Sequence, residues 1–114
     1  MDQISFEDFK KIEIKVGKII SAERIEGSDK LLKLEVDSGL SEAGESIKRQ
    51  IIAGIAQFYA PESLIGKECP FAYNLAPRVL KGLESQGMIL CPSGESGPVL
   101  LHPDKEVPPG AIIK

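Results

Sequence analysis

The chain has 114 residues, of which 42% are hydrophobic and 27% charged, with a net charge of −3 and an isoelectric point near 5.2. This length supports one hydrophobic core but not two, and the composition excludes a disordered segment. No apolar run approaches the roughly 20 residues of a membrane helix, and the first residues do not form a secretory signal, so we expect a cytoplasmic protein.

The chain begins with a short helical segment and a long strand. Ser5 precedes two acidic residues and a Lys-Lys pair, which is the order of an N-cap, a first turn and a last turn of a helix. Apolar residues at positions 12, 14 and 16 then alternate with polar ones, as on a half-buried strand, and we expect this strand to run on to Ile25. Gly17 predicts a bend or a bulge within it.

Two further strands follow after polar turns. Residues 26–30 predict a turn, and residues 32–37 predict a second strand in which apolar and charged side chains alternate. A loop rich in Gly and Ser leads to a third strand at residues 47–53. Residues 54–64 fit a helix or helical turns interrupted by Pro61.

The second half of the chain predicts a fourth strand at residues 69–75 and a fifth at 86–91, separated by an elaborate loop. Five strands with a short helix between the third and fourth is the element order of an OB-fold, a small Greek-key barrel. We therefore predict an all-β fold in a single domain, residues 1–114, with the barrel at about 12–91 and extensions at either end. Another small β-barrel or a sandwich would fit the same pattern.

Catalytic chemistry has little support in this sequence. The single histidine, His102, precedes a proline in the C-terminal tail, and the glycine-flanked run at residues 82–87 is not followed by the Lys of a phosphate-binding loop. Cys69 and Cys91 have no metal-type spacing and are expected to be free thiols. We expect no catalytic residue, no metal and no cofactor.

Basic side chains gather where an OB-fold binds its ligand, on strands two and three and on the loops that join strands one to two and four to five. Six cations fall there: Lys30, Lys33, Lys48, Arg49, Arg78 and Lys81. An acidic chain can therefore present a basic groove to phosphate groups, because the local field governs binding. The alternative is that these are ordinary surface lysines, paired with Glu35 or Asp37.

Neutral residues in the same loop would complete a binding site. Asn74, Ser85 and Gln86 offer hydrogen-bonding groups suited to base edges or ribose hydroxyls. Met88 offers an apolar surface to a base, although a Met that opens a strand is more often a core residue. Four Phe, two Tyr and no Trp argue against an extended stacking platform, so the pattern favours a structured RNA over single strands.

Three stretches carry a resemblance to a known family: KIEIKVGKIISAERIEGSDKLLKLEVDSG, RQIIAGIAQFYAPESLIGK and NLAPRVLKGLESQGMIL. Together they resemble the tRNA-binding domain found at the C-terminus of many methionyl-tRNA synthetases, in free-standing tRNA-binding proteins and in auxiliary proteins of synthetase complexes. The match covers about residues 9–90, and the final VLLHPDKEVPPGAIIK resembles the tail of the synthetase appendix.

The resemblance implies an OB-fold that binds tRNA by backbone and shape. The resemblance further implies that the domain is not catalytic by itself and that it increases the affinity of a fused or separate methionyl-tRNA synthetase for tRNA. The resemblance also implies a homodimer whose interface is formed by residues 1–11 and 92–114. The family's RNA contacts would fall on Lys30, Lys33, Asn74, Arg78, Ser85 and Met88. Relatives often carry Lys where Ala76 stands, so this loop is less basic than many.

Two other classes of function stay open at this point. A dimeric chaperone-like relative with the same barrel would bind polypeptides through an exposed apolar groove. A purely structural docking module would dimerise and bind RNA weakly. The basic loops favour tRNA over both, and the polar strand faces show no obvious surplus of apolar residues.

Overall fold

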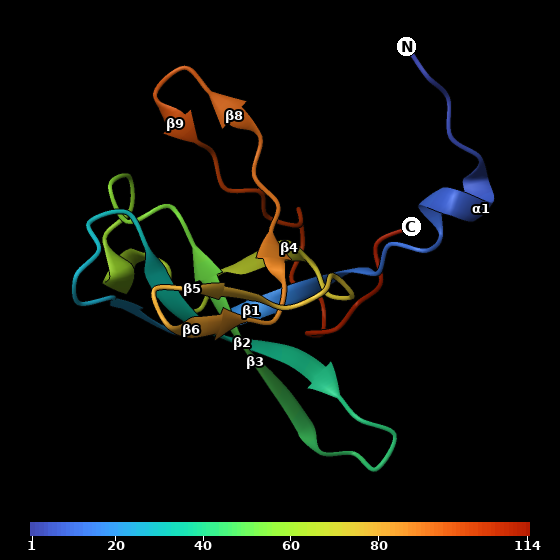
Figure 1. The fold of residues 1–114 in the computed structure, drawn as a ribbon. Helices are drawn as coiled ribbons and strands as arrows, with labels where there is room; N and C mark the ends of the chain where they lie inside the picture. Colours follow the sequence, from blue (N-terminus) through green and yellow to red (C-terminus); the bar gives the residue numbers. More distant parts are fainter.

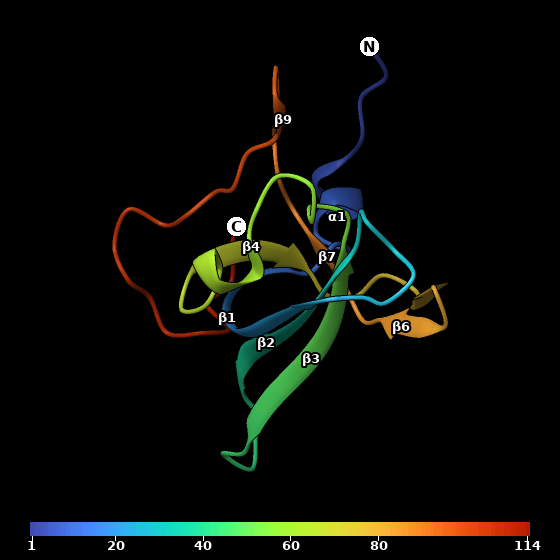
Figure 2. The ribbon, with the colours of Figure 1, turned by 90° about the vertical axis from the view of Figure 1, so that its left-hand side faces the viewer.

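Three long strands form the body of the fold (Figure 1). In the computed structural model, which describes residues 1–114, β1 (Ile14–Arg24), β2 (Leu32–Leu40) and β3 (Ser46–Ala53) form an antiparallel meander. β4 (Glu68–Ala72) pairs with β1, and β7 (Met88–Ile89) pairs with β4, so the strand order is β3-β2-β1-β4-β7. The sheet curls into a half-barrel (Figure 2), which confirms the predicted OB-like fold.

The alternation of apolar residues along these strands builds the core. Because successive side chains point to opposite faces of a strand, the apolar set of each strand gathers inside the curl. Burial of each large apolar side chain contributes roughly 1.5–3 kcal/mol. The largest fully buried side chains are Phe71, Ile19, Leu32, Leu34, Ile51, Leu64 and Val36.

Gln86 and Gly87, which we call the closing segment, lie between β7 and β3 and complete the wall of the barrel. The Gln86 N–H donates to the Gln50 carbonyl (2.8 Å), and the Gln50 N–H donates to the Gln86 side-chain oxygen (3.0 Å). Gly87 lies so close to the sheet that a Cβ there would be 2.8 Å from the Ala72 carbonyl oxygen. A side chain at position 87 would therefore push this closing segment away from the barrel.

Three predicted elements are corrected by the structure. The fourth strand ends at Ala72 rather than at residue 75, and the fifth consists of Met88 and Ile89 alone. Between them the expected loop contains a hairpin of β5 (Arg78–Leu80) and β6 (Leu83–Ser85). Its two turn residues both have positive φ, 50° at position 81 and 78° at position 82, as in the type I′ turn that suits a tight hairpin.

The helical region between β3 and β4 is smaller than its expected range of residues 54–64. It consists of turns and a three-residue 3₁₀ helix, η1 (Pro61–Ser63). The bulge in β1 lies between Ile19 and Ser21 rather than at Gly17. Gly17 instead makes room for Tyr73, because a Cβ at position 17 would lie 2.4 Å from the Tyr73 hydroxyl.

The two ends of the chain come together beside β1. Helix α1 (Phe6–Phe9) is capped by Ser5 as predicted, since the Ser5 hydroxyl oxygen accepts the Asp8 N–H (3.0 Å). The C-terminal tail forms a small hairpin of β8 (Ser93–Gly94) and β9 (Gly97–Pro98). It then returns along the part of β1 that β2 does not cover, where the N–H of residue 113 donates to the carbonyl of residue 14 (2.9 Å). None of the helices has the length and apolar character that crossing a lipid bilayer requires.

Candidate nucleic-acid interface

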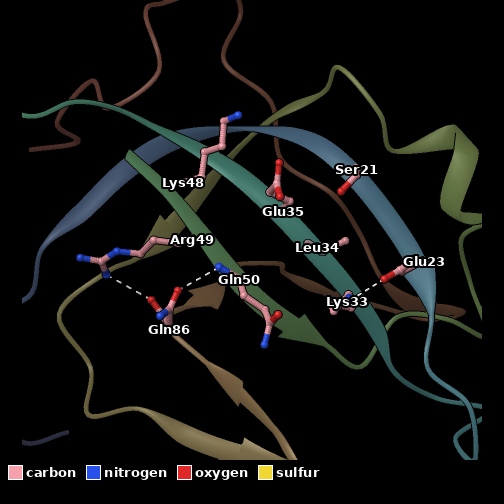
Figure 3. Close-up of a pocket in the computed structure, with 9 residues that line it drawn as sticks. All are labelled: Ser21, Glu23, Lys33, Leu34, Glu35, Lys48, Arg49, Gln50 and Gln86. Atoms are coloured by element: carbon pink, nitrogen blue, oxygen red, sulfur yellow. Dashed lines mark hydrogen bonds and ion pairs between the residues drawn. The ribbon is translucent and has the colours of Figure 1, made fainter. Parts of the chain in front are cut away.

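A polar groove of about 360 Å³ crosses the outer face of β1, β2 and β3 (Figure 3). The polar groove forms because, along each strand, the residues that alternate with the buried apolar residues point to this face. Cross-strand pairs such as Glu23 with Lys33 and Glu35 with Gln50 lie side by side on it. We call this the polar groove, and its lining residues are Ser21, Glu23, Lys33, Leu34, Glu35, Lys48, Arg49, Gln50 and Gln86.

The cations of the polar groove are not equivalent. Lys33 forms an ion pair with Glu23 across the β1–β2 register, whereas Lys48 forms no ion pair and is exposed. No ion pair joins these lysines to Glu35 or Asp37, although the β2–β3 register places Lys48 opposite Asp37. An exposed ion pair contributes at most about 1 kcal/mol, so a phosphate group could compete with Glu23 for Lys33.

Arg49 is held by the fold at the edge of the polar groove (Figure 3). Its Nη1 donates to the backbone carbonyls of Tyr73 and Gln86, the latter at 3.1 Å. Its guanidinium also lies over the Tyr73 ring, 5.1 Å from the ring centre. Arg49 thus ties β3 to the closing segment, while the other edge of its guanidinium carries N–H groups with no protein partner.

Two further hollows continue from the polar groove towards the β5–β6 hairpin. The first, of about 390 Å³, shares Lys48, Arg49 and Gln86 with the polar groove and reaches Leu75. The second, of about 100 Å³, also includes Leu75 and lies against the hairpin. Its other lining residues are Ile52, Ala76, Arg78, Leu80, Ser85, Gly87 and Met88. We call the polar groove and these two hollows together the binding face.

The β5–β6 hairpin carries two of the predicted cations. Arg78 and Lys81 are exposed and form no ion pair. The hairpin is fixed to β3 because the Gln50 side-chain amide donates to the Glu84 carbonyl (2.9 Å). Two unpaired cations therefore project from an anchored hairpin at one end of the binding face.

Besides Arg49, and Gln86, whose side-chain oxygen accepts the Gln50 N–H, two more of the predicted contact residues are engaged by the fold. Ser85 is 5% exposed, and its hydroxyl accepts the Ile52 N–H (3.0 Å) and donates to the Gly87 carbonyl (2.9 Å). The Asn74 side chain accepts the Glu13 N–H (2.7 Å) and donates to a carbonyl of the N-terminal segment. Both side chains hold the loop in position, so we leave them out of the contact set proposed below.

Three further predicted residues, Lys30, Lys81 and Met88, lie outside the polar groove. Lys30 lies at the β1–β2 turn and Lys81 at the hairpin turn, and neither lines the binding face, although both are exposed. Met88 lies in the hollow at the hairpin and is 46% exposed. Tyr73, the aromatic residue next to Asn74, is buried, and this burial raises the pKa of its hydroxyl. It is a core residue.

Sequence reasoning missed the part played by Gln50. This residue is bonded through its backbone and its side chain to the closing segment and to the hairpin. Its position two residues after Lys48 on the same strand was a usable signal, because residues i and i+2 share a face. Its partners lie 34 and 36 residues further along the chain, and no local pattern indicates them.

Comparison with known proteins adds to this geometry. A family model described as "Putative tRNA binding domain" matches residues 14–112. The chain is 46% identical to a methionine–tRNA ligase of Caldanaerobacter subterraneus subsp. tengcongensis over 113 residues, covering 99% of this chain. It spans only 17% of the length of that ligase.

Two solved structures are similar along their whole length. A MetRS-related protein from Pyrococcus horikoshii has a TM-score of 0.88 and 39% sequence identity, with both chains fully covered. The chaperone CsaA of Bacillus anthracis has a TM-score of 0.83 and 31% identity, with 99% of this chain and all of that chain covered.

Proposed function

Because this chain belongs to the tRNA-binding domain family, we propose that it binds tRNA without catalysing a reaction and acts in the cytoplasm with a methionine–tRNA ligase. It would be either the C-terminal part of that enzyme or a separate subunit. The observation that carries the proposal is the set of unpaired cations around the binding face, with Lys48 in the polar groove and Arg78 on the hairpin. Lys30 and Lys81 would extend this set at the rim.

The binding face favours recognition of tRNA by its backbone and shape. Lys48 and Arg78 are separate, exposed cations that suit phosphate groups along a folded strand. Phosphate contacts fix the position of a protein on RNA but carry no sequence information, so we expect little preference among tRNAs. Met88 in its small hollow would contact a sugar or a base edge. Joined to a ligase, the domain would raise the local concentration of tRNA near the enzyme.

We further propose that the domain is a homodimer, formed through a second groove at the chain ends. This terminal groove has a volume of about 770 Å³. Its lining residues are Phe6, Phe9, Lys10, Lys11, Ile12, Glu13, Ile14, Lys15, Ile112, Ile113 and Lys114. Helix α1 has no buried residue, and four residues are far too few for a helix to be stable by itself. A second copy covering this groove would bury its apolar side chains, with residues 1–11 and 92–114 at the interface.

Polypeptide binding is a second candidate function. It is favoured by the similarity to the chaperone CsaA and by the apolar terminal groove, which could hold an extended apolar segment. In that case unfolded polypeptide and self-association would compete for one surface, because both need the same apolar residues.

The proposed function is tested by titrating the chain with bulk tRNA at several salt concentrations. Four to six phosphate contacts give a slope of log affinity against log salt on the order of −3 to −5. The double change Arg78→Ala with Lys30→Ala should weaken binding to all tRNAs about equally and make the slope shallower by roughly 2. Lys105→Ala is the control for loss of a surface charge, since it removes an exposed lysine of the C-terminal tail, outside both the β1–β2 turn and the β5–β6 hairpin.

Each contrary outcome identifies a different alternative. A weak and salt-independent curve would exclude tRNA as the ligand. If unfolded polypeptide then bound tightly, the chaperone-like function would replace the proposal. If neither ligand bound and the chain was a stable dimer, a docking module would be the better account.

A further inference from the structure

Cys69 lies on β4, and Cys91 lies two residues after the end of β7, the strand that pairs with β4. β4 and β7 pair in an antiparallel register that places Phe71 opposite Ile89, and the ladder continues with the N–H of residue 90, which donates to the Pro70 carbonyl (3.0 Å). If this register continues by one more residue, Cys91 lies opposite Cys69, and the electrostatic effect of Cys91 on the pKa of Cys69 agrees with such proximity. Both thiols are free in the structure.

This position in the ladder suits a disulfide. Pro70 and Leu90 form a hydrogen-bonded pair, so the next pair, Cys69 with Cys91, is of the non-hydrogen-bonded kind. Residues in such a pair have Cα atoms about 4.5 Å apart and side chains on the same face of the sheet. That spacing falls within the range of about 4.4–6.8 Å that a disulfide needs.

The surroundings of the pair lower the thiolate fraction at neutral pH, so both thiols react slowly there. Burial raises the pKa of the Cys69 thiol to about 11, and the proximity of Cys91 raises it further. Burial also raises the pKa of Cys91, which is only half-buried. The His102 Nδ1 lies 3.8 Å from the Cys69 sulfur and 2.7 Å from the Glu68 carbonyl oxygen. A carbonyl only accepts hydrogen bonds, so Nδ1 carries its proton and cannot take one from the thiol.

We propose that Cys69 and Cys91 are a redox modification site, which closes to an intramolecular disulfide under a small-molecule disulfide oxidant. The more exposed Cys91 thiolate attacks one sulfur of the oxidant and forms a mixed disulfide with it. The sulfur–sulfur bond of the oxidant breaks, and one small thiolate leaves. The Cys69 thiolate then attacks the Cys91 sulfur and expels the second small thiolate. The chain loses two electrons and two protons, and the oxidant is reduced to two thiols.

The bond would close a loop of the chain that contains the β5–β6 hairpin. Residues 70–90 all lie between the two cysteines, and this segment holds Arg78, Met88 and the residues that close the barrel. Cys91 is also the last residue before the C-terminal extension. The disulfide would restrict the unfolded chain and stabilise the fold. Its formation does not depend on whether the binding face takes tRNA.

The test is to treat the folded, reduced chain with oxidised glutathione. We expect the intact mass to fall by two hydrogens, and trypsin to release residues 68–78 joined to residues 82–105. The rate should increase about tenfold for each pH unit below the thiol pKa, because the thiolate is the attacking form. The unfolding midpoint should rise by about 5–10 °C and return with a reductant.

Two variants are the controls. Cys91→Ser should show no fall in mass and no rise in the unfolding midpoint. Cys69→Ala should stop at a single glutathione bound to Cys91. If the unaltered chain stops at that stage, joins to a second chain, or keeps both thiols free, the proposal is wrong. These outcomes come from the mass of the unaltered chain, so they hold even if a variant folds poorly.

Discussion

The polar groove and the terminal groove differ in chemistry and in origin. The polar groove lies on the outer face of β1, β2 and β3, and Leu34 is the only apolar residue among those that line it. The terminal groove lies where the two chain ends meet, and its apolar lining consists of Phe and Ile side chains from the N-terminal segment and Ile side chains from the C-terminal end. One small domain therefore offers a polar surface that suits a charged ligand and an apolar surface that suits another protein.

The two grooves differ because β1, β2 and β3 pack around the barrel core, whereas most of the two chain extensions lie outside it. On β1, β2 and β3 the apolar residues are used inside the barrel, so alternation leaves polar residues outside. Of the extensions, residues 1–11 and 92–114, only Leu100 packs against that core. Phe6 is 70% exposed and Ile112 is 69% exposed, which is unusual for apolar side chains gathered around one groove.

The largest expected effect is on the terminal groove. We expect the double change Phe6→Glu with Ile112→Glu to weaken the proposed dimer more than a hundredfold, because two charges would lose water on association. Sedimentation velocity would measure this. Val79→Glu is the matched control, since Val79 is 71% exposed but lies on the hairpin.

The same variant also tests whether the two grooves act independently. If the salt slope for tRNA stays unchanged per chain while the dimer is lost, the grooves have separate partners. Loss of tRNA binding together with the dimer would contradict this separation. An unaltered chain that is monomeric at high concentration would remove the proposed dimer altogether.

The second expected effect is on the wall of the polar groove. Arg49→Ala removes the donor to the carbonyls of Tyr73 and Gln86, so we expect the free energy of unfolding to fall by about 2–3 kcal/mol. Urea unfolding would measure the change. Lys48→Ala on the same strand should cost less than about 0.5 kcal/mol, because Lys48 is exposed and has no ion-pair partner. Equal losses in the two variants would show that Arg49 is not a structural clamp.

A third and smaller effect distinguishes paired from unpaired cations in the polar groove. Lys48→Ala should lower tRNA affinity about threefold to tenfold and reduce the salt slope by about 0.9. Glu23→Gln should raise the affinity, because it frees Lys33 from its ion pair and removes a negative charge from the groove. A Glu23→Gln variant that binds tRNA less tightly would mean that phosphate does not approach this side of the groove.

The sequence predicted the barrel better than it predicted the site. The N-cap at Ser5 and the strands β1, β2 and β3 follow from local patterns, namely capping order, alternation and Gly-rich turns. The β5–β6 hairpin was missed because its turn is Lys81-Gly82, where a non-glycine residue takes positive φ. The common Asn-Gly or Asp-Gly signal is absent.

The structure leaves some of the predicted contact residues free at the surface and engages others in the fold. Lys48 and Arg78 are exposed and unpaired, as a surface contact requires. Ser85 and Asn74 have the right chemistry but bind partners 33 and 61 residues away along the chain. A polar residue in a loop serves the fold or a ligand according to what tertiary contacts bring near it, which one sequence does not reveal.

The smallest expected effect concerns the region between the two grooves. Lys15 lines the terminal groove and Arg49 the polar groove, and both lie over the ring of Tyr73. A hydrogen bond from Lys15 lowers the pKa of Glu13 from its usual 4.5. Because the pKa of Glu13 is lower in the folded chain, the Glu13 carboxylate of the unfolded chain is protonated first as the pH falls. The stabilisation is present above about pH 4.5 and is lost as the pH falls through the lower, folded pKa.

Glu13→Gln should remove this part of the acid sensitivity, measured as urea unfolding between about pH 5 and 3. We expect a few tenths of a kcal/mol, because the pair is exposed and well screened. The matched control is Glu7→Gln on α1, an exposed acid that forms no ion pair. If the two variants lose stability in parallel on acidification, the Glu13–Lys15 contact adds nothing. A difference confined to Glu13→Gln would show that this contact helps to hold β1 where the two grooves meet.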